Sequence, residues 1–110
     1  MSSLYAQYTK EIHGREVLES DYGFVVYELK DDVCYIADIY VDPLSRRSKI
    51  ATDLASAVED IAKEKGAKKL LGSIIPTTKG STASLRAMLA YGFSLQSCHE
   101  NFIWLEKEIV

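Results

Sequence analysis

The chain has 110 residues, 47% hydrophobic and 26% charged, which suits one globular domain and excludes intrinsic disorder as its main state. With 13 basic and 16 acidic residues the net charge is -3, which argues against general electrostatic binding of nucleic acid. No apolar run reaches the roughly 20 residues of a membrane helix and no secretion signal is recognisable, so we expect a cytoplasmic protein without a membrane partner.

Four apolar residues in the first 20 positions have an ambiguous spacing. Leu4, Tyr5, Tyr8 and Ile12 fit either a short helical stripe or part of a first strand. We therefore expect a shortened N-terminal element, with room for one strand or a short helix.

Two segments rich in β-formers follow, at residues 23–29 and 34–41. The polar turn 30–32 between them is short, which predicts an antiparallel hairpin. Cys34 in this hairpin and Cys98 lack a CxxC spacing, so we expect free thiols. The two histidines have no ligand-type spacing either, and we expect no metal.

A long amphipathic helix comes next. Ile50, Leu54, Val58 and Ile61 recur at spacings of three and four, which places them on one helix face. Gly66 is the natural end of this helix.

The remaining elements complete a mixed sheet. A strand at 69–75 ends before Pro76, a helix capped by Ser81 or Thr82 reaches Tyr91, and strands follow at 93–98 and 102–107. Strand, helix and strand make a βαβ unit with parallel strands. The predicted fold class is α+β: a mixed, mostly antiparallel sheet with a central βαβ unit and two main helices. We expect one domain over 1–110, made of the element 1–20, a core 23–75 and a C-terminal part 81–110.

Basic residues gather where the long helix begins. Arg46, Arg47 and Lys49 lie beside a helix N-terminus, whose positive partial charge and unpaired N–H groups disfavour cations. A basic turn between a strand and a helix suits a phosphate-type anion. The alternative is a solvated surface turn that binds nothing.

Two stretches resemble the GNAT superfamily of N-acetyltransferases: residues 35–43 (YIADIYVDP) and 46–51 (RRSKIA). In that family a strand ends in a Val-x-Pro-like turn, followed by R/Q-x-x-G-x-G/A and a helix. Gly66, the strand 69–75 and the segment 84–93, which ends in Gly-Phe, follow in the family's order. The resemblance covers about residues 20–107.

The resemblance implies acetyl-CoA as cosubstrate. It implies that backbone groups of the basic turn cradle the pyrophosphate, that the strand before it holds the acyl end, and that the second helix borders the cofactor. The cofactor-binding residues so implied are Ile39, Tyr40, Val41, Arg46, Arg47, Ser48, Lys49, Ile50, Ala51, Ser81 and Ser84.

Four positions depart from the family pattern, one of them Ser81, which stands where the second helix often begins with Asn. Lys49 stands where the central Gly of the motif is expected, and Gly permits a closer backbone approach to phosphate. Met88 stands where many members carry the Tyr that protonates the leaving thiolate, and methionine donates no proton. Ala37 stands where many members place a Glu as general base.

Two tyrosines remain as catalytic candidates, Tyr35 and Tyr91, the latter about one helical turn from the family position. Strict alternation along the strand places Tyr35 and Ile39 on the face of Ala37, and Asp38 on the opposite face. This leaves few groups for acid–base work.

The sequence thus favours a GNAT-like N-acetyltransferase that transfers acetyl to an amine. Because so few residues precede the hairpin, we expect an open acceptor side, or one completed in a homodimer, and this favours a protein acceptor. One alternative is a catalytically inactive GNAT-fold binding or regulatory protein. Another is an unrelated α+β domain with a chance basic turn.

Overall fold

The computed structural model describes residues 3–46 and 48–110, so Met1, Ser2 and Arg47 lie outside the described residues. These described residues form ten elements. They are α1 (Leu4–His13), β1 (Glu16–Glu19), β2 (Gly23–Lys30), β3 (Val33–Val41), the 3-10 turn η1 (Pro43–Ser45), α2 (Ile50–Glu64), β4 (Lys69–Ile74), α3 (Ser81–Tyr91), β5 (Ser94–His99) and β6 (Phe102–Glu108). Two of them, α1 and β1, lie in the ambiguous N-terminal stretch, and all the others except the 3-10 turn η1 lie close to the predicted positions.

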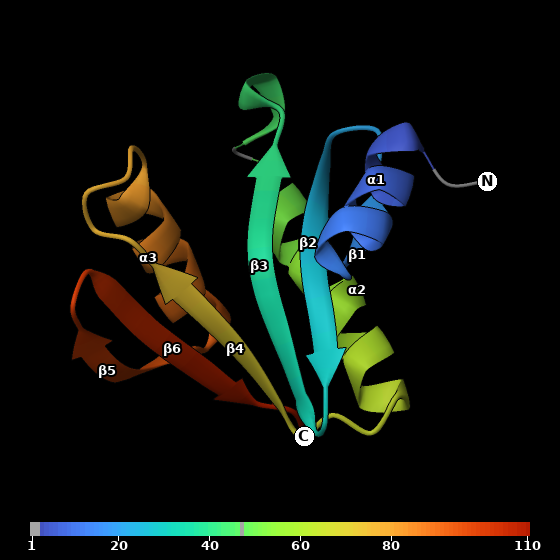
Figure 1. Ribbon diagram of the computed structural model, residues 1–110. Coiled ribbons are helices and arrows are strands. Elements are labelled where there is room, and N and C mark those ends of the chain that lie inside the picture. The colour runs from blue at the N-terminus through green and yellow to red at the C-terminus, as the bar shows by residue number, and fades with distance from the viewer. Residues whose placement is uncertain (1–2, 47) are drawn as a thin grey trace.

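One six-stranded sheet runs through the molecule in the order β1-β2-β3-β4-β6-β5. All neighbouring strands are antiparallel except β3 and β4, which flank α2 in the chain and pair in parallel, as predicted. Helices α2 and α3 pack on one face of this sheet and α1 lies on the other (Figure 1). The predicted fold class is confirmed.

The core forms between α2 and the sheet. Leu54 and Val58 on α2 are buried as their spacing predicts, while Ile50 and Ile61 are partly buried at its edge. The largest side chains with less than 2% exposure are Leu70, Leu105, Val25, Val58 and Cys34. Burying such apolar area supplies most of the stabilisation of a domain of this size.

The N-terminal segment contains a helix and a strand, so the expectation of one or the other was wrong. Ser3 caps α1 by accepting the Ala6 N–H at 3.0 Å, and Gly14 ends the helix in a left-handed conformation with φ 69°. Strand β1 then pairs with β2 as a further antiparallel strand. Helix α1 therefore lies over the sheet instead of extending it.

A β-bulge interrupts the alternation of β3. Val26 pairs with Asp38, but the next residue of β2, Tyr27, pairs with Ile36, so Ala37 is left unpaired. The bulge places Asp38 on the α1 face together with Tyr35. The prediction that Asp38 lies on the opposite face from Tyr35 was therefore wrong, because alternation restarts after the extra residue.

The same bulge also separates Tyr35 from Ile39, which were predicted to share a face. Ile39 pairs with the buried Val25 and so belongs to the α2 face.

No helix among the described residues is long and apolar enough to cross a membrane.

Candidate functional site

The parallel strands β3 and β4 separate part-way along their length. They pair from Val33 and Lys69 to Ile36 and Gly72, and the remaining halves have no ladder between them. Each strand then leads to a helix, and the connections to α2 and α3 lie at the same end of the molecule (Figure 1). In open sheets, ligands bind outside the carboxyl ends of parallel strands, at this kind of separation.

The turn between β3 and α2 is braced from within. Arg46 donates through Nε to the Val41 carbonyl at 3.0 Å, and its Cζ lies 5.4 Å from the ring centroid of Tyr40. The Ser48 hydroxyl donates to the Ser45 carbonyl at 2.6 Å. These bonds shape the turn, and they leave the other guanidinium nitrogens of the exposed Arg46 at the surface.

The N-cap of helix α2 is Lys49, which adopts a left-handed conformation with φ 60° and makes no side-chain capping bond. The first intrahelical bond runs from Asp53 N to the Lys49 carbonyl at 2.9 Å, so the N–H groups of Ile50 and Ala51 have no partner within the helix. The predicted residue Arg47 lies outside the described residues. The backbone here suits an anion.

Helix α3 begins in a similar way. Gly80 is its N-cap with φ 83° and provides no side chain to cap it. The expected cap was wrong, because the Ser81 hydroxyl turns back to the Pro76 carbonyl at 2.8 Å. Ser84 is exposed on the first turn, and its N–H bonds to the Gly80 carbonyl at 3.0 Å. Two helix N-termini thus face the separated strand ends.

Ile39, predicted to hold the acyl end through its backbone, has its N–H bonded to the Asp38 carboxylate Oδ1 at 2.9 Å. This bond fixes the Asp38 side chain beside the bulge. Ile39 and Tyr40 are exposed to 38% and 45%. The strand surface beyond the bulge is therefore accessible.

Tyr35 lies where the two strands begin to separate. Its hydroxyl and that of Ser73 on β4 are 3.0 Å apart, either one donating. Its ring centroid is 6.2 Å from that of Trp104, at a tilt of 44°. The sequence did not single out Ser73, because nothing local marks it as the partner of a residue 38 positions away.

Tyr91 is part of a different cluster, between α2, α3 and β6. Its hydroxyl donates to Glu59 at 2.7 Å, and Lys107 Nζ binds the other oxygen of that carboxylate at 2.9 Å. Burial raises the pKa of Tyr91 to about 12, with a smaller contribution from the Glu59 carboxylate. Glu59 lies nine residues into α2, about 13 Å along the helix from its start. The structure does not bring Tyr91 to the basic turn.

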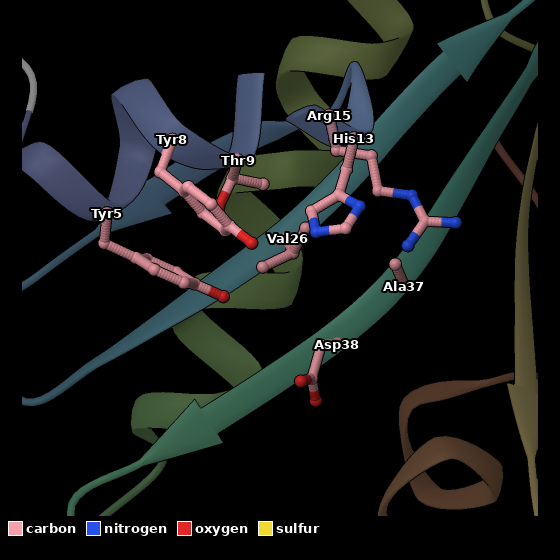
Figure 2. A pocket seen from close by; sticks show the side chains of 8 residues that line it. All are labelled: Tyr5, Tyr8, Thr9, His13, Arg15, Val26, Ala37 and Asp38. Atoms are coloured by element: carbon pink, nitrogen blue, oxygen red, sulfur yellow. The ribbon is translucent and has the colours of Figure 1, made fainter. Parts of the chain in front are cut away.

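A cleft of about 230 Å³ opens on the other face, between α1 and strands β2 and β3 (Figure 2). Its polar side chains come from two sides, α1 with the turn that follows it and the bulge of β3. Tyr5, Tyr8, Thr9, His13 and Arg15 line the first side, and Val26, Ala37 and Asp38 line the other. The sequence missed this cleft, although apolar residues at 34, 36, 39 and 41 have a spacing of two, three and two that marks the bulge.

Comparison with protein families identifies the fold. Residues 7–105 match the model of the acetyltransferase (GNAT) family. The chain belongs to the GNAT family. Nearly the whole sheet, helices α2 and α3 and most of α1 lie within the match in this GNAT domain. The suspected resemblance is confirmed, and the alternative of an unrelated α+β domain was wrong.

Solved structures of the same fold carry acetyltransferase names. The PaiA N-acetyltransferase of Thermoplasma acidophilum, in complex with coenzyme A, is 17% identical with a TM-score of 0.76, covering 96% of this chain and 68% of that one. A Bacillus subtilis acetyltransferase in complex with CoA is 16% identical (TM-score 0.72; 94% and 83% covered). The ribosomal-protein-S18-alanine N-acetyltransferase of Escherichia coli is 15% identical (TM-score 0.67; 84% and 69% covered).

At these identities the neighbours establish the fold alone. A comparison with curated protein sequences finds no match. The prediction that acetyl-CoA is the cosubstrate is confirmed by membership of the family. Which residues of this chain bind it stays a prediction.

Proposed function

We propose that this GNAT domain binds acetyl-CoA at the separated ends of β3 and β4 and transfers the acetyl group to an amine. The observation that carries the proposal is the left-handed, uncapped start of α2 directly after the strand that parts from β4. Because the chain belongs to an acetyltransferase family, the anion expected at this helix start is the pyrophosphate of acetyl-CoA.

The phosphate end of the cosubstrate fits the start of α2. The N–H groups of Ile50 and Ala51, which have no partner within the helix, attract a pyrophosphate together with the helix dipole, and the Arg46 guanidinium and Lys49 ammonium add charge. We extend this role to Ser48 and, by sequence alone, to Arg47. Ser81 and Ser84, at the start of α3, border the same space.

The acetyl end fits the half of β3 that pairs with β2 but not with β4, where Ile39, Tyr40 and Val41 present backbone groups. A neutral amine attacks the thioester carbonyl carbon, so that a C–N bond forms, the C–S bond breaks, and the sulfur leaves as a thiolate. The amine nitrogen loses one proton and the thiolate gains one, which makes acid–base groups useful on both sides.

Three groups near the strand separation can serve that exchange of protons. Asp38 and His13 line the cleft on the α1 face, where an amine would enter, and either can accept its proton. Tyr35 lies at the separation itself, where its hydroxyl can donate to the thiolate and recover a proton through Ser73. Tyr91 is held by Glu59 away from this region.

A thermal-shift titration with acetyl-CoA tests the binding step. A ligand that binds the native state raises the melting temperature. At one hundred times its Kd it adds about 3 kcal/mol to the free energy of unfolding. Arg46→Ala should weaken this shift, whereas Lys49→Gly should keep or enlarge it. No shift at saturating acetyl-CoA would refute the proposed function.

Release of CoA, measured by chromatography in the presence of a broad amine panel, tests the transfer step. We expect CoA and N-acetylated product in equal amounts. Binding without release across the whole panel would instead favour the alternative of a GNAT-fold binding or regulatory protein. A cytoplasmic location, a single folding unit over 1–110 and a homodimer stay predictions, the last to be tested by analytical ultracentrifugation.

A further inference from the structure

We propose that the cleft between α1 and the β3 bulge binds a small zwitterionic acceptor, an amino acid whose carboxylate pairs with Arg15 and whose amine lies at Asp38. This inference rests on the proposed acetyl transfer and names its substrate class. The cleft carries a cation and an anion on opposite sides of the bulged residue Ala37 (Figure 2).

Arg15 supplies the cation of the cleft. Its Nε is the buried side-chain donor that lacks a hydrogen bond among the residues that the structure describes. The nearest carboxylate, Glu28 Oε2, lies 3.5 Å from Nε, an ion pair without a hydrogen bond. The Arg15 side chain as a whole is 37% exposed, so Nε is buried beside Glu28 while another part of the side chain is open to a ligand.

The position of the guanidinium suits a ligand. Cζ lies 5.7 Å from the ring centroid of Tyr35, and Figure 2 shows the side chain reaching along β3 beside Ala37. The planar fork of arginine binds a carboxylate through two parallel hydrogen bonds. A carboxylate in the cleft would bind the guanidinium through its other nitrogens, because Nε itself is buried and faces Glu28.

The opposite end of the cleft suits an amine. The bulge turns Asp38 to the α1 face, and the Ile39 N–H holds its Oδ1 at 2.9 Å. The side chains of Tyr5, Tyr8 and Thr9 add hydroxyls on the α1 side. An ammonium group meets its counter-charge at Asp38. Before attack it passes a proton to the Asp38 carboxylate or to the His13 imidazole, which also lines the cleft.

The spacing agrees with an amino acid. Tyr35, beneath the guanidinium, and Asp38 are three residues apart, about 10 Å along a strand and less across a bulge. The amine and carboxyl carbon of an α-amino acid are about 2.5 Å apart, and two hydrogen bonds extend that span to about 8 Å. The cleft volume of about 230 Å³ is below that of sites for drug-sized ligands.

A protein lysine fits this cleft less well than the sequence suggested. Its ammonium group can meet Asp38, but it brings no free carboxylate to pair with Arg15, so only one end of the cleft is used. The structure thus favours a small acceptor over the predicted protein acceptor.

The test compares each free amino acid of a panel with its carboxamide and with the amine that lacks the carboxyl group. We expect kcat/KM for the best free acid to exceed that of its carboxamide by about 10–100-fold, the range for a charge-assisted hydrogen bond. Arg15→Gln should remove that preference by raising KM for the free acid alone. Arg86→Gln, an exposed arginine on α3, is the matched control.

Equal rates for acid and carboxamide in the unaltered protein would overturn the proposal while leaving acetyl transfer intact, and this comparison needs no variant. A preference that survives in Arg15→Gln, or a preference for peptides with an internal lysine, would also overturn it. Failure of every acceptor together with failure to bind acetyl-CoA would refute the proposed function as well.

Discussion

Lys49 has a backbone conformation that usually belongs to glycine. A left-handed conformation costs a residue with a Cβ about 1–2 kcal/mol, partly offset by the extra freedom of glycine in the unfolded chain. We therefore expect Lys49→Gly to raise the free energy of unfolding by about 0.5–1 kcal/mol, measured by urea denaturation. The same change should leave acetyl-CoA affinity equal or higher, because the backbone can approach the phosphate more closely.

Glu100 provides the control for that prediction. It has a left-handed φ of 58° in the turn between β5 and β6 and takes no part in the proposed site. Glu100→Gly should stabilise the chain by a similar amount without changing acetyl-CoA affinity. A large loss of affinity in Lys49→Gly would mean that the ammonium group, and not the backbone, binds the phosphate.

Two glycines differ in what a methyl group would meet. A Cβ on Gly23 would lie 2.3 Å from the Tyr40 carbonyl oxygen, whereas one on Gly72 would lie 2.3 Å from the terminal carbon of Met88. Backbone cannot yield, but a methionine side chain can. We expect Gly23→Ala to cost about 2–3 kcal/mol and Gly72→Ala under about 1 kcal/mol, read from urea midpoints. Equal losses would contradict this local packing.

Cys34 makes stability fall in alkaline solution. Burial raises the pKa of its thiol from 9.0 to about 11, so between these values the unfolded chain loses a proton that the folded chain keeps. Stability is therefore complete below pH 9 and declines toward pH 11. Cys34→Ala should flatten the decline measured by urea denaturation at pH 8 and 10.5, whereas the exposed Cys98→Ala should not.

At the level of single residues, the sequence predicted the position of the basic turn but not its internal geometry. Charge and order place Arg46 and Lys49 at the start of the long helix. The inward bond from Arg46 to Val41 and the left-handed φ of Lys49 depend on where the strand ends in space. No local pattern encodes either.

Among the elements, the link between α2, α3 and β6 gives a direct test of Tyr91. Tyr91→Phe removes the hydrogen bond to Glu59 and should cost about 1–2 kcal/mol of stability, because that bond goes to a charged group. We expect kcat for acetyl transfer to stay within twofold. The exposed Tyr22→Phe is the stability control. A tenfold loss of kcat in Tyr91→Phe would restore its catalytic role.

Element positions were predictable where periodicity is strong. The spacing of Leu54 and Val58 determined α2, and β-formers determined β2 and β3, within a few residues. Helix α1 was ambiguous because Tyr5 and Tyr8 are compatible with either period and only contacts with the sheet decide between them. The bulge at Ala37 was missed because strict alternation was assumed across an irregular strand.

For the whole molecule, the order of elements and the family resemblance predicted one sheet with a helix-flanked parallel pair. The acceptor side was not predictable in the same way. The cleft forms because α1 packs across β2 toward β3, and the bulge turns Asp38 to that face. Both are long-range facts that a count of residues before the hairpin does not contain.

Helix α1 forms one wall of the cleft yet buries only one of its ten residues, Thr9. It is held by exposed contacts, such as the Lys10–Glu16 ion pair and a 5.2 Å ring contact between Tyr5 and Phe24. Few buried contacts mean a low free energy of local opening, so its amide hydrogens should exchange with solvent well before those of α2. An acceptor in the cleft should then slow exchange in α1 selectively, which hydrogen-exchange mass spectrometry detects without any turnover.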